Sequence, residues 1–146
     1  MPIIEASSTI NDSMPQYVID RTMRLLSRKS QKAISGSKVL VLGIAYKKDI
    51  DDLRDSPALI VMEKLKEEGA NVDYFDKLNP KYEQEDGTIK EGLESISPEI
   101  IAEYDIVIIT TSHTTVDYQM VVDNAQLVFD TRYATKGIKA DNLELL

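Results

Sequence analysis

Three cationic side chains stand close together in a chain that is acidic overall. Lys47, Lys48 and Arg54 fall within one short segment, whereas the chain of 146 residues carries a formal net charge of −8. A guanidinium can bind a phosphate or carboxylate through two parallel hydrogen bonds, and an ammonium attracts the same anion as a point charge. The segment therefore predicts a site for an anionic ligand, with a phosphate as the candidate. Aspartates alternate with these cations, so a solvated loop with self-neutralising charges is the alternative.

The position of this segment favours the ligand interpretation. The preceding residues 39–42 form an unbroken apolar run, which is typical of a strand buried on both faces of a parallel sheet. Gly43 ends that strand, and Ser56 followed by Pro57 is a favourable start for a helix. About a dozen residues separate the strand from the helix, where roughly 2 to 6 are usual in α/β units. Open α/β sheets place their ligands at such loops, at the carboxyl ends of the strands.

Polar side chains follow three later predicted strands as well. Asp76 could bind ribose hydroxyls, with an ordinary turn residue as the alternative. His113 could act as a general base or contact a ligand, with a polar loop histidine as the alternative. Because parallel strands end at the same edge of a sheet, we expect Lys47, His113 and Arg132 to converge on one rim. The three strands are predicted at residues 71–75, 105–111 and 127–129.

The turn after the first strand does not carry a dinucleotide fingerprint. Such a fingerprint requires glycines at the spacing G-x-G-x-x-G. Here Gly43 is followed by Ala45 and Lys48 at the other two positions. A complete NAD site is therefore not expected at this turn, and Gly43 alone is equally compatible with a tight exit from the strand.

The remaining patterns define the fold class. A loose lead-in at residues 1–13 precedes a helix that we expect from about Ser13 to Lys29, with Pro15 in its first turn. Strands alternate with helices, which favours right-handed crossovers and a parallel sheet. We therefore predict an α/β protein, a doubly wound, Rossmann-like three-layer sandwich with a mainly parallel sheet, preceded by an N-terminal helix. The other helices are predicted at residues 56–68, 97–104 and 115–123, and a short strand or hairpin within 76–92.

Composition excludes several classes of function. The absence of cysteine removes disulfides and a thiol nucleophile, and a single histidine makes a conventional transition-metal site unexpected. The acidic balance argues against nucleic acid and anionic membranes as partners. The sequence also contains neither an apolar run of roughly 20 residues nor a signal-peptide pattern. A cytoplasmic location is therefore expected.

Residues 39–58 resemble the signature that opens the C-terminal domain of the UDP-glucose/GDP-mannose dehydrogenase family. Residues 10–18 are similar to the end of that family's central helical domain. The stretches 111–113 and 129–132 match later landmarks of the same domain. The sequences of residues 10–15 and 130–132 are closer to those of the branch that acts on UDP-N-acetylhexosamines than to those of UDP-glucose dehydrogenases.

The resemblance implies a function for the parent enzyme. Members of the family oxidise the C6 alcohol of a nucleotide sugar to a carboxylate in two NAD-dependent steps, and a cysteine serves as the nucleophile. Their N-terminal domain binds NAD, and their C-terminal domain holds the UDP part of the substrate. By motif position, Tyr46 and Lys47 match substrate-contacting residues, and Arg132 matches a further substrate contact. Arg54 matches a residue that reaches the NAD of the neighbouring domain. The resemblance assigns no catalytic residue and no metal ligand to this chain.

The resemblance also implies a domain division and a set of partners. Residues 1–36 would be the end of a central helical domain with a connector, and residues 37–146 a Rossmann-like UDP-sugar-binding domain. The partners would be a UDP-sugar and the NAD-binding and central helical domains of the parent enzyme. That enzyme would be a homo-oligomer that serves polysaccharide biosynthesis, and the isolated chain would be inactive. The alternatives are a UDP-glucose 6-dehydrogenase domain, a stand-alone nucleotide-binding or regulatory module, and a structural unit assembled through its N-terminal helix.

Overall fold

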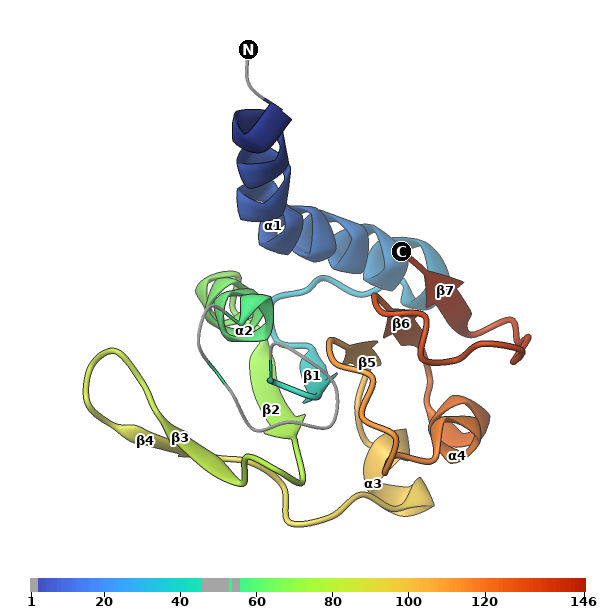
Figure 1. Cartoon of the computed structure of the whole chain (residues 1–146). Helices are drawn as coiled ribbons and strands as arrows, with labels where there is room; N and C mark the ends of the chain where they lie inside the picture. The colour runs from blue at the N-terminus through green and yellow to red at the C-terminus, as the bar shows by residue number, and fades with distance from the viewer. Residues whose placement is uncertain (1–2, 46–52, 54–55) are drawn as a thin grey trace.

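The computed structural model describes residues 3–45, 53 and 56–146, with side chains from residue 14 onward. Within this part of the chain, a parallel sheet has the strand order β2-β1-β5-β6-β7, and all four neighbouring pairs are parallel. The predicted parallel α/β sheet is thus confirmed (Figure 1). Its strands are β1 (Lys38–Leu42), β2 (Asn71–Phe75), β5 (Ile106–Ile109), β6 (Val128–Asp130) and β7 (Leu143–Leu145).

Helices cover both faces of the sheet and make it the middle of three layers (Figure 1). Side chains alternate along β1, so that Val39 and Val41 face one core and Leu40 and Leu42 face the other. All four are fully buried, which explains why this strand is an uninterrupted apolar run. The helices α1 (Ile3–Ser30) and α2 (Pro57–Glu67) close the first core, and α3 (Pro98–Ala102) and α4 (Tyr118–Asn124) close the second.

The start of α2 connects this helix to the end of β1. Ser56 is the N-cap residue, as predicted, and Pro57 occupies the first turn. The Ser56 hydroxyl does not cap the helix but donates a hydrogen bond to the carbonyl of Ile44, just beyond β1. The residues that flank the long β1–α2 segment are therefore held together at its base.

The N-terminal helix is longer than the sequence pattern indicates. It begins at Ile3, so the prediction of a loose lead-in is wrong for residues 3–13. Pro15 lies inside α1 rather than in its first turn. A proline removes one backbone donor and crowds the carbonyl one turn earlier, which bends a helix without having to end it. Figure 1 shows a pronounced bend in α1 between its N-terminal half and the half that packs on the domain.

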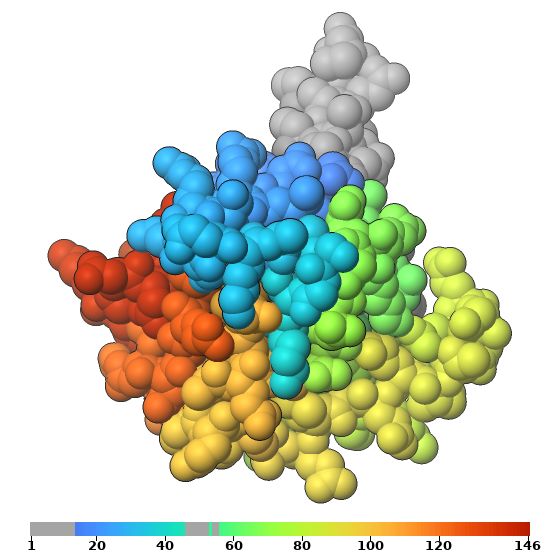
Figure 2. All heavy atoms as spheres, turned by 180° about the vertical axis from the view of Figure 1, so that it is seen from behind, coloured from blue at the N-terminus to red at the C-terminus, as the bar shows by residue number. Residues whose placement is uncertain are grey.

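Two further elements lie outside the main helices and strands. The predicted hairpin is confirmed, with β3 (Lys81–Glu83) and β4 (Ile89–Glu91) paired antiparallel, and it extends from the body of the domain (Figures 1 and 2). Strand β7 was not predicted, because it has three residues and a central glutamate, Glu144. Arg21 of α1 donates hydrogen bonds to Glu144 and to the carbonyl of Leu145, so contacts distant in sequence stabilise this edge strand. No helix of the described chain is long and apolar enough to cross a membrane.

Candidate functional site

The strand order reverses between β1 and β5. From β1 the chain passes through α2 to β2 on one side, and then through α3 to β5 on the other side of β1. In open α/β sheets, ligands bind at the carboxyl ends of the strands at such a switch point. The segments that meet there are residues 43–45 after β1 and residues 110–113 after β5. They define the edge on which the sequence places its candidate residues, and we call it the carboxyl edge.

Gly43 lets β1 leave the sheet directly beside β5. Its φ is +84°, and its N–H donates to the carbonyl of Phe75 at 2.9 Å. A Cβ added at Gly43 would lie 2.5 Å from Cβ of Thr111, a distance that side chains do not adopt. The Thr111 hydroxyl donates to the carbonyl of Ala45 at 2.6 Å, and the Thr110 hydroxyl donates to the carbonyl of Gly43. The exit of β1 is thus fixed both by the absence of a side chain and by the threonines of the neighbouring strand.

Asp76 is a buried carboxylate at this edge. It is 2% exposed, and its Oδ2 accepts hydrogen bonds from the N–H groups of Ile44 at 2.8 Å and Ala45 at 3.3 Å. Its Oδ1 accepts from the N–H of Leu78 at 2.9 Å, a contact typical of a turn residue, which was the alternative interpretation of Asp76. His113 Nε2 lies 3.0 Å from Oδ2. Because these contacts use both oxygens inside the protein, the carboxylate is not presented to a ribose.

His113 is buried rather than exposed in a polar loop. It is 3% exposed, and it is held through both its ring and its backbone. Because a carboxylate only accepts hydrogen bonds, this contact requires the form of His113 that carries a proton on Nε2. The Tyr118 hydroxyl donates to the carbonyl of His113 at 3.0 Å. The loop after β5 is therefore anchored to α4 and to the end of β2.

Arg132 follows β6 and reaches the neighbouring strand end. Its Nε donates to the carbonyl of Thr110 at 3.1 Å. Buried Asp130 accepts from the N–H of Arg132 at 3.0 Å and from the N–H and hydroxyl of Thr135 at 2.8 and 2.6 Å. A cavity of about 430 Å³ opens here, lined by residues 130–133 and the exposed Leu145 and Leu146. The guanidinium thus stands at the carboxyl edge beside a space that could hold part of a ligand.

The sequence-predicted residues fall into two groups. His113 and Arg132 lie at the carboxyl edge, in the segments that follow the adjacent strands β5 and β6, as expected. Tyr46, Lys47, Lys48 and Arg54 lie outside the described residues. The convergence of Lys47 with His113 and Arg132 therefore stays a prediction, as do the proposed contacts of Tyr46 and Arg54. The hydrogen bonds that Asp76 makes to His113 and to the β1 exit were not predicted. The sequence places both side chains after strands at the same edge, but it carries no signal for the hydrogen bonds themselves.

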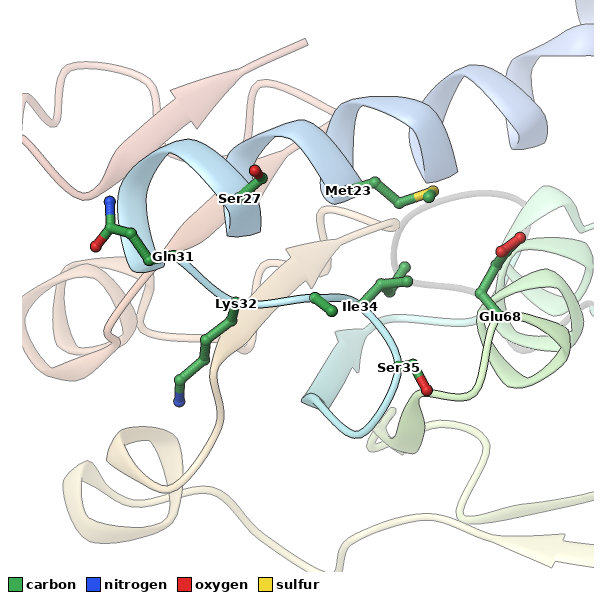
Figure 3. A pocket seen from close by; sticks show the side chains of 8 residues that line it. Met23, Ser27, Gln31, Lys32, Ile34, Ser35 and Glu68 are labelled. Carbon is green, nitrogen blue, oxygen red and sulfur yellow. The ribbon is translucent and has the colours of Figure 1, made fainter.

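A larger cavity lies at the opposite edge of the sheet. It has a volume of about 680 Å³ and is lined by the end of α1, the connector that leads to β1, and the end of α2 (Figure 3). These segments precede β1 and β2, whereas ligands of doubly wound sheets bind beyond the strands' carboxyl ends. Among the described residues, no group of three or more potential metal ligands occurs. The carboxyl edge is therefore the candidate site.

The comparison with protein families defines the class of this protein. Residues 40–137 match the family model described as the UDP-glucose/GDP-mannose dehydrogenase family, UDP binding domain. The matched region runs from β1 past Arg132 and so includes the segments after β1, β2, β5 and β6 at the carboxyl edge. The chain belongs to this family, as its sequence resemblance indicated.

Individual relatives agree with this assignment. A UDP-N-acetyl-D-mannosamine dehydrogenase of Campylobacter jejuni is 42% identical over 69 residues, which is 47% of this chain and 16% of the relative. A UDP-N-acetyl-D-glucosamine 6-dehydrogenase of Salmonella typhi is 29% identical over 111 residues, 76% of this chain and 25% of the relative. The chain thus spans only a minor part of the length of the curated relatives that it matches.

Solved structures share the fold over nearly the whole chain. The UDP-N-acetyl-mannosamine dehydrogenase of Staphylococcus aureus superimposes with a TM-score of 0.68 at 26% identity, covering 94% of this chain and 31% of that one. The UDP-D-ManNAc dehydrogenase of Pyrococcus horikoshii reaches a TM-score of 0.76 at 22% identity, covering 94% and 31%. At that identity the second likeness supports the fold alone.

Proposed function

We propose that this chain is the UDP-sugar-binding domain of an NAD-dependent nucleotide-sugar 6-dehydrogenase. The observation that carries the proposal is the family match to a UDP binding domain over residues 40–137, which contains the switch-point edge and Arg132. The parent enzyme would oxidise a UDP-N-acetylhexosamine to its uronic acid, since relatives are named for dehydrogenation of UDP-N-acetylmannosamine and UDP-N-acetylglucosamine. We further propose the division into residues 1–36 and 37–146.

In this proposal the carboxyl edge binds the anionic nucleotide. Tyr46, Lys47 and Arg132 contact the UDP-sugar, and Arg54 reaches NAD held by a neighbouring domain. The guanidinium of Arg132, oriented by the carbonyl of Thr110, supplies positive charge to a phosphate, and Asp130 holds the backbone N–H of the same residue. In a chain with a net charge of −8, such cations must overcome general repulsion of an anion, so their loss is expected to be costly.

The described residues do not fit the pyrophosphate of NAD at the first turn. Dinucleotide sites of this fold hold the pyrophosphate on free backbone N–H groups after the first strand. Here the N–H groups of Ile44 and Ala45 donate to Asp76, and residue 45 is not a glycine. NAD, which accepts hydride when bound, would therefore be held mainly by another domain of the parent enzyme. This agrees with the absence of a thiol nucleophile from the chain.

The remaining parts of the proposal concern the parent protein. We propose a cytoplasmic homo-oligomer in which this domain packs against central helical and NAD-binding domains and serves polysaccharide biosynthesis. The UDP-glucose branch is a second candidate for the substrate, because a UDP-glucose 6-dehydrogenase of Rhizobium meliloti is 37% identical over 100 residues. A stand-alone nucleotide-binding module is the non-enzymatic alternative, and a reading frame that ends close to this chain on both sides would favour it.

Calorimetric titration of the purified chain tests the proposal. The ligands are UDP, UDP-N-acetylglucosamine, UDP-glucose and NAD, at equal concentrations and low ionic strength. We expect binding of the three uridine nucleotides and much weaker heat, or none, with NAD. Binding of NAD as strong as that of UDP, or the absence of binding by every uridine nucleotide, would contradict the proposed function.

A further inference from the structure

We propose that Asp76 and His113 form a positioning pair that sets the affinity of the carboxyl edge for UDP. The inference rests on the proposed function, and it concerns residues for which the sequence resemblance gives no role. Neither side chain is exposed enough to bind the ligand, with 2% exposure for Asp76 and 3% for His113. Their effect on binding would act through the backbone of Ile44 and Ala45, whose N–H groups the carboxylate accepts.

The pair connects the ends of three strands. Asp76 follows β2, the N–H groups that it accepts follow β1, and His113 follows β5. The direction in which the chain leaves β1 is thus specified from both neighbouring strands at once. Ile44 and Ala45 are fully buried and directly precede Tyr46 and Lys47 in the sequence. Since the proposed function assigns substrate contacts to Tyr46 and Lys47, we expect a displacement of Ile44 and Ala45 to weaken UDP binding.

The donors that surround position 76 suit the negative charge of an aspartate. A buried carboxylate is tolerated only where donors satisfy it, and here the donors come from the N–H groups of Ile44, Ala45 and Leu78 and from His113. An asparagine has the same shape but one acceptor oxygen and an NH₂ group, which would face these donors. Asp76→Asn therefore removes part of the anchor while preserving the volume of the side chain.

A second aspartate provides a matched control at the other edge of the sheet. Asp105 precedes β5, accepts the N–H of Lys38 at the start of β1 at 2.8 Å and pairs with the ammonium of Lys32. It thus anchors the same strand β1 through a backbone N–H, but at the amino edge. Asp105→Asn is expected to lower stability without changing the affinity for UDP, because this anchor lies away from the proposed binding edge.

The experiment compares UDP affinity in the wild-type chain, Asp76→Asn and Asp105→Asn, at a temperature at which circular dichroism shows all three folded. We expect UDP to bind Asp76→Asn about tenfold more weakly than wild type, the loss typical of a removed charge-assisted contact. Asp105→Asn should bind UDP like wild type. Absence of UDP binding by the wild type would contradict the proposed function itself. Equal UDP affinity of wild type and Asp76→Asn would overturn the positioning role alone.

Two variants of His113 distinguish its role as a hydrogen-bond donor from its role in packing. His113→Gln retains an N–H donor at a similar distance from the backbone, whereas His113→Leu retains only volume. If the hydrogen bond to Asp76 matters, UDP affinity should fall several-fold in His113→Leu and recover most of the way in His113→Gln. An equal loss of affinity in both variants would overturn the hydrogen-bonded pair as the cause.

Hydrogen exchange measured by NMR provides a readout independent of UDP. The amides of Ile44 and Ala45 should exchange faster in Asp76→Asn than in wild type and Asp105→Asn, since Asp76 accepts these two N–H groups. Unchanged protection of both amides in Asp76→Asn would overturn the proposed anchor.

Discussion

At the scale of single residues, the carboxyl edge is shaped by side chains whose hydrogen bonds are made within the protein. Asp76 and His113 hold the backbone at the switch point, and Asp130 shapes the turn that carries Arg132. The sequence indicated that such residues share an edge, because each follows a strand. It could not indicate that Asp76 bonds to His113, since that contact depends on the register of β2, β1 and β5. Local sequence also gave no reason to expect Asp76 to accept N–H groups located beyond β1.

Gly43 gives a prediction at this scale. Gly43→Ala combines a left-handed backbone with a Cβ placed 2.5 Å from Cβ of Thr111. The two costs together should lower the free energy of unfolding by about 2 to 5 kcal/mol, measured by urea denaturation. Gly137 has the same φ of +84° but no atom within 4 Å of an added Cβ. Gly137→Ala should therefore cost only about 1 to 2 kcal/mol, and an equal loss for both variants would contradict the steric argument.

At the scale of elements, burial on both faces made the central strands predictable. The apolar runs of β1 and β5 are fully buried, and their predicted positions are confirmed. Two predictions missed for physical reasons. Pro15 favoured a helix start near residue 13, yet α1 continues through it to Ile3. Strand β7 is too short and too polar to be recognised, and its contact with Arg21 of α1 joins positions distant in sequence.

The junction of β1, β5 and the connector after α1 gives a prediction for pH dependence. Burial raises the pKa of Asp105, but hydrogen bonds from Lys32 and from the N–H of Lys38 outweigh it, so the net pKa is lower than 3.8. A carboxyl with a lowered folded-state pKa contributes stability above its unfolded pKa and loses it as pH falls through the folded value. The stability difference between wild type and Asp105→Asn should therefore be largest near neutral pH and shrink below about pH 4.

Urea denaturation at about pH 6 and about pH 3 measures this difference. Both proteins should be destabilised by acid through their other carboxyls, so the quantity of interest is the gap between them. A gap that stays constant or widens on acidification would contradict the ionic anchor at Asp105.

At the scale of the whole molecule, the chain corresponds to only one part of the larger proteins that it resembles. It spans 31% of the length of the Staphylococcus aureus structure that it resembles and has no cysteine. Of the described residues after β1, Ile44 and Ala45 donate their amides to Asp76, so these two amides do not offer the usual pyrophosphate cradle. Family membership, the parallel sheet and the location of the edge were all accessible from sequence. The substrate contacts at Tyr46, Lys47 and Arg54 lie outside the described residues and stay predictions.

The isolated chain should lack dehydrogenase activity. Oxidation of an alcohol to a carboxylate in two steps requires a bound hydride acceptor and, in the proposed chemistry, a thiol nucleophile. The assay follows NADH absorbance with each UDP-sugar and NAD at high concentration of the purified chain. Sustained NADH production that survives repeated purification would contradict the division of labour between domains.

We propose that the cation-rich segment after β1 binds UDP, and substitution of Lys47 is the direct test of this proposal. UDP is titrated calorimetrically into the wild-type chain, Lys47→Ala and Lys48→Ala; both substitutions remove one positive charge, but a substrate contact is proposed only for Lys47. Loss of a charge-assisted contact costs about 1.5 to 3 kcal/mol, so UDP should bind Lys47→Ala roughly tenfold or more weakly. Lys48→Ala should lose much less affinity. Small and equal losses in both variants would contradict the account and favour a solvated, self-neutralising loop.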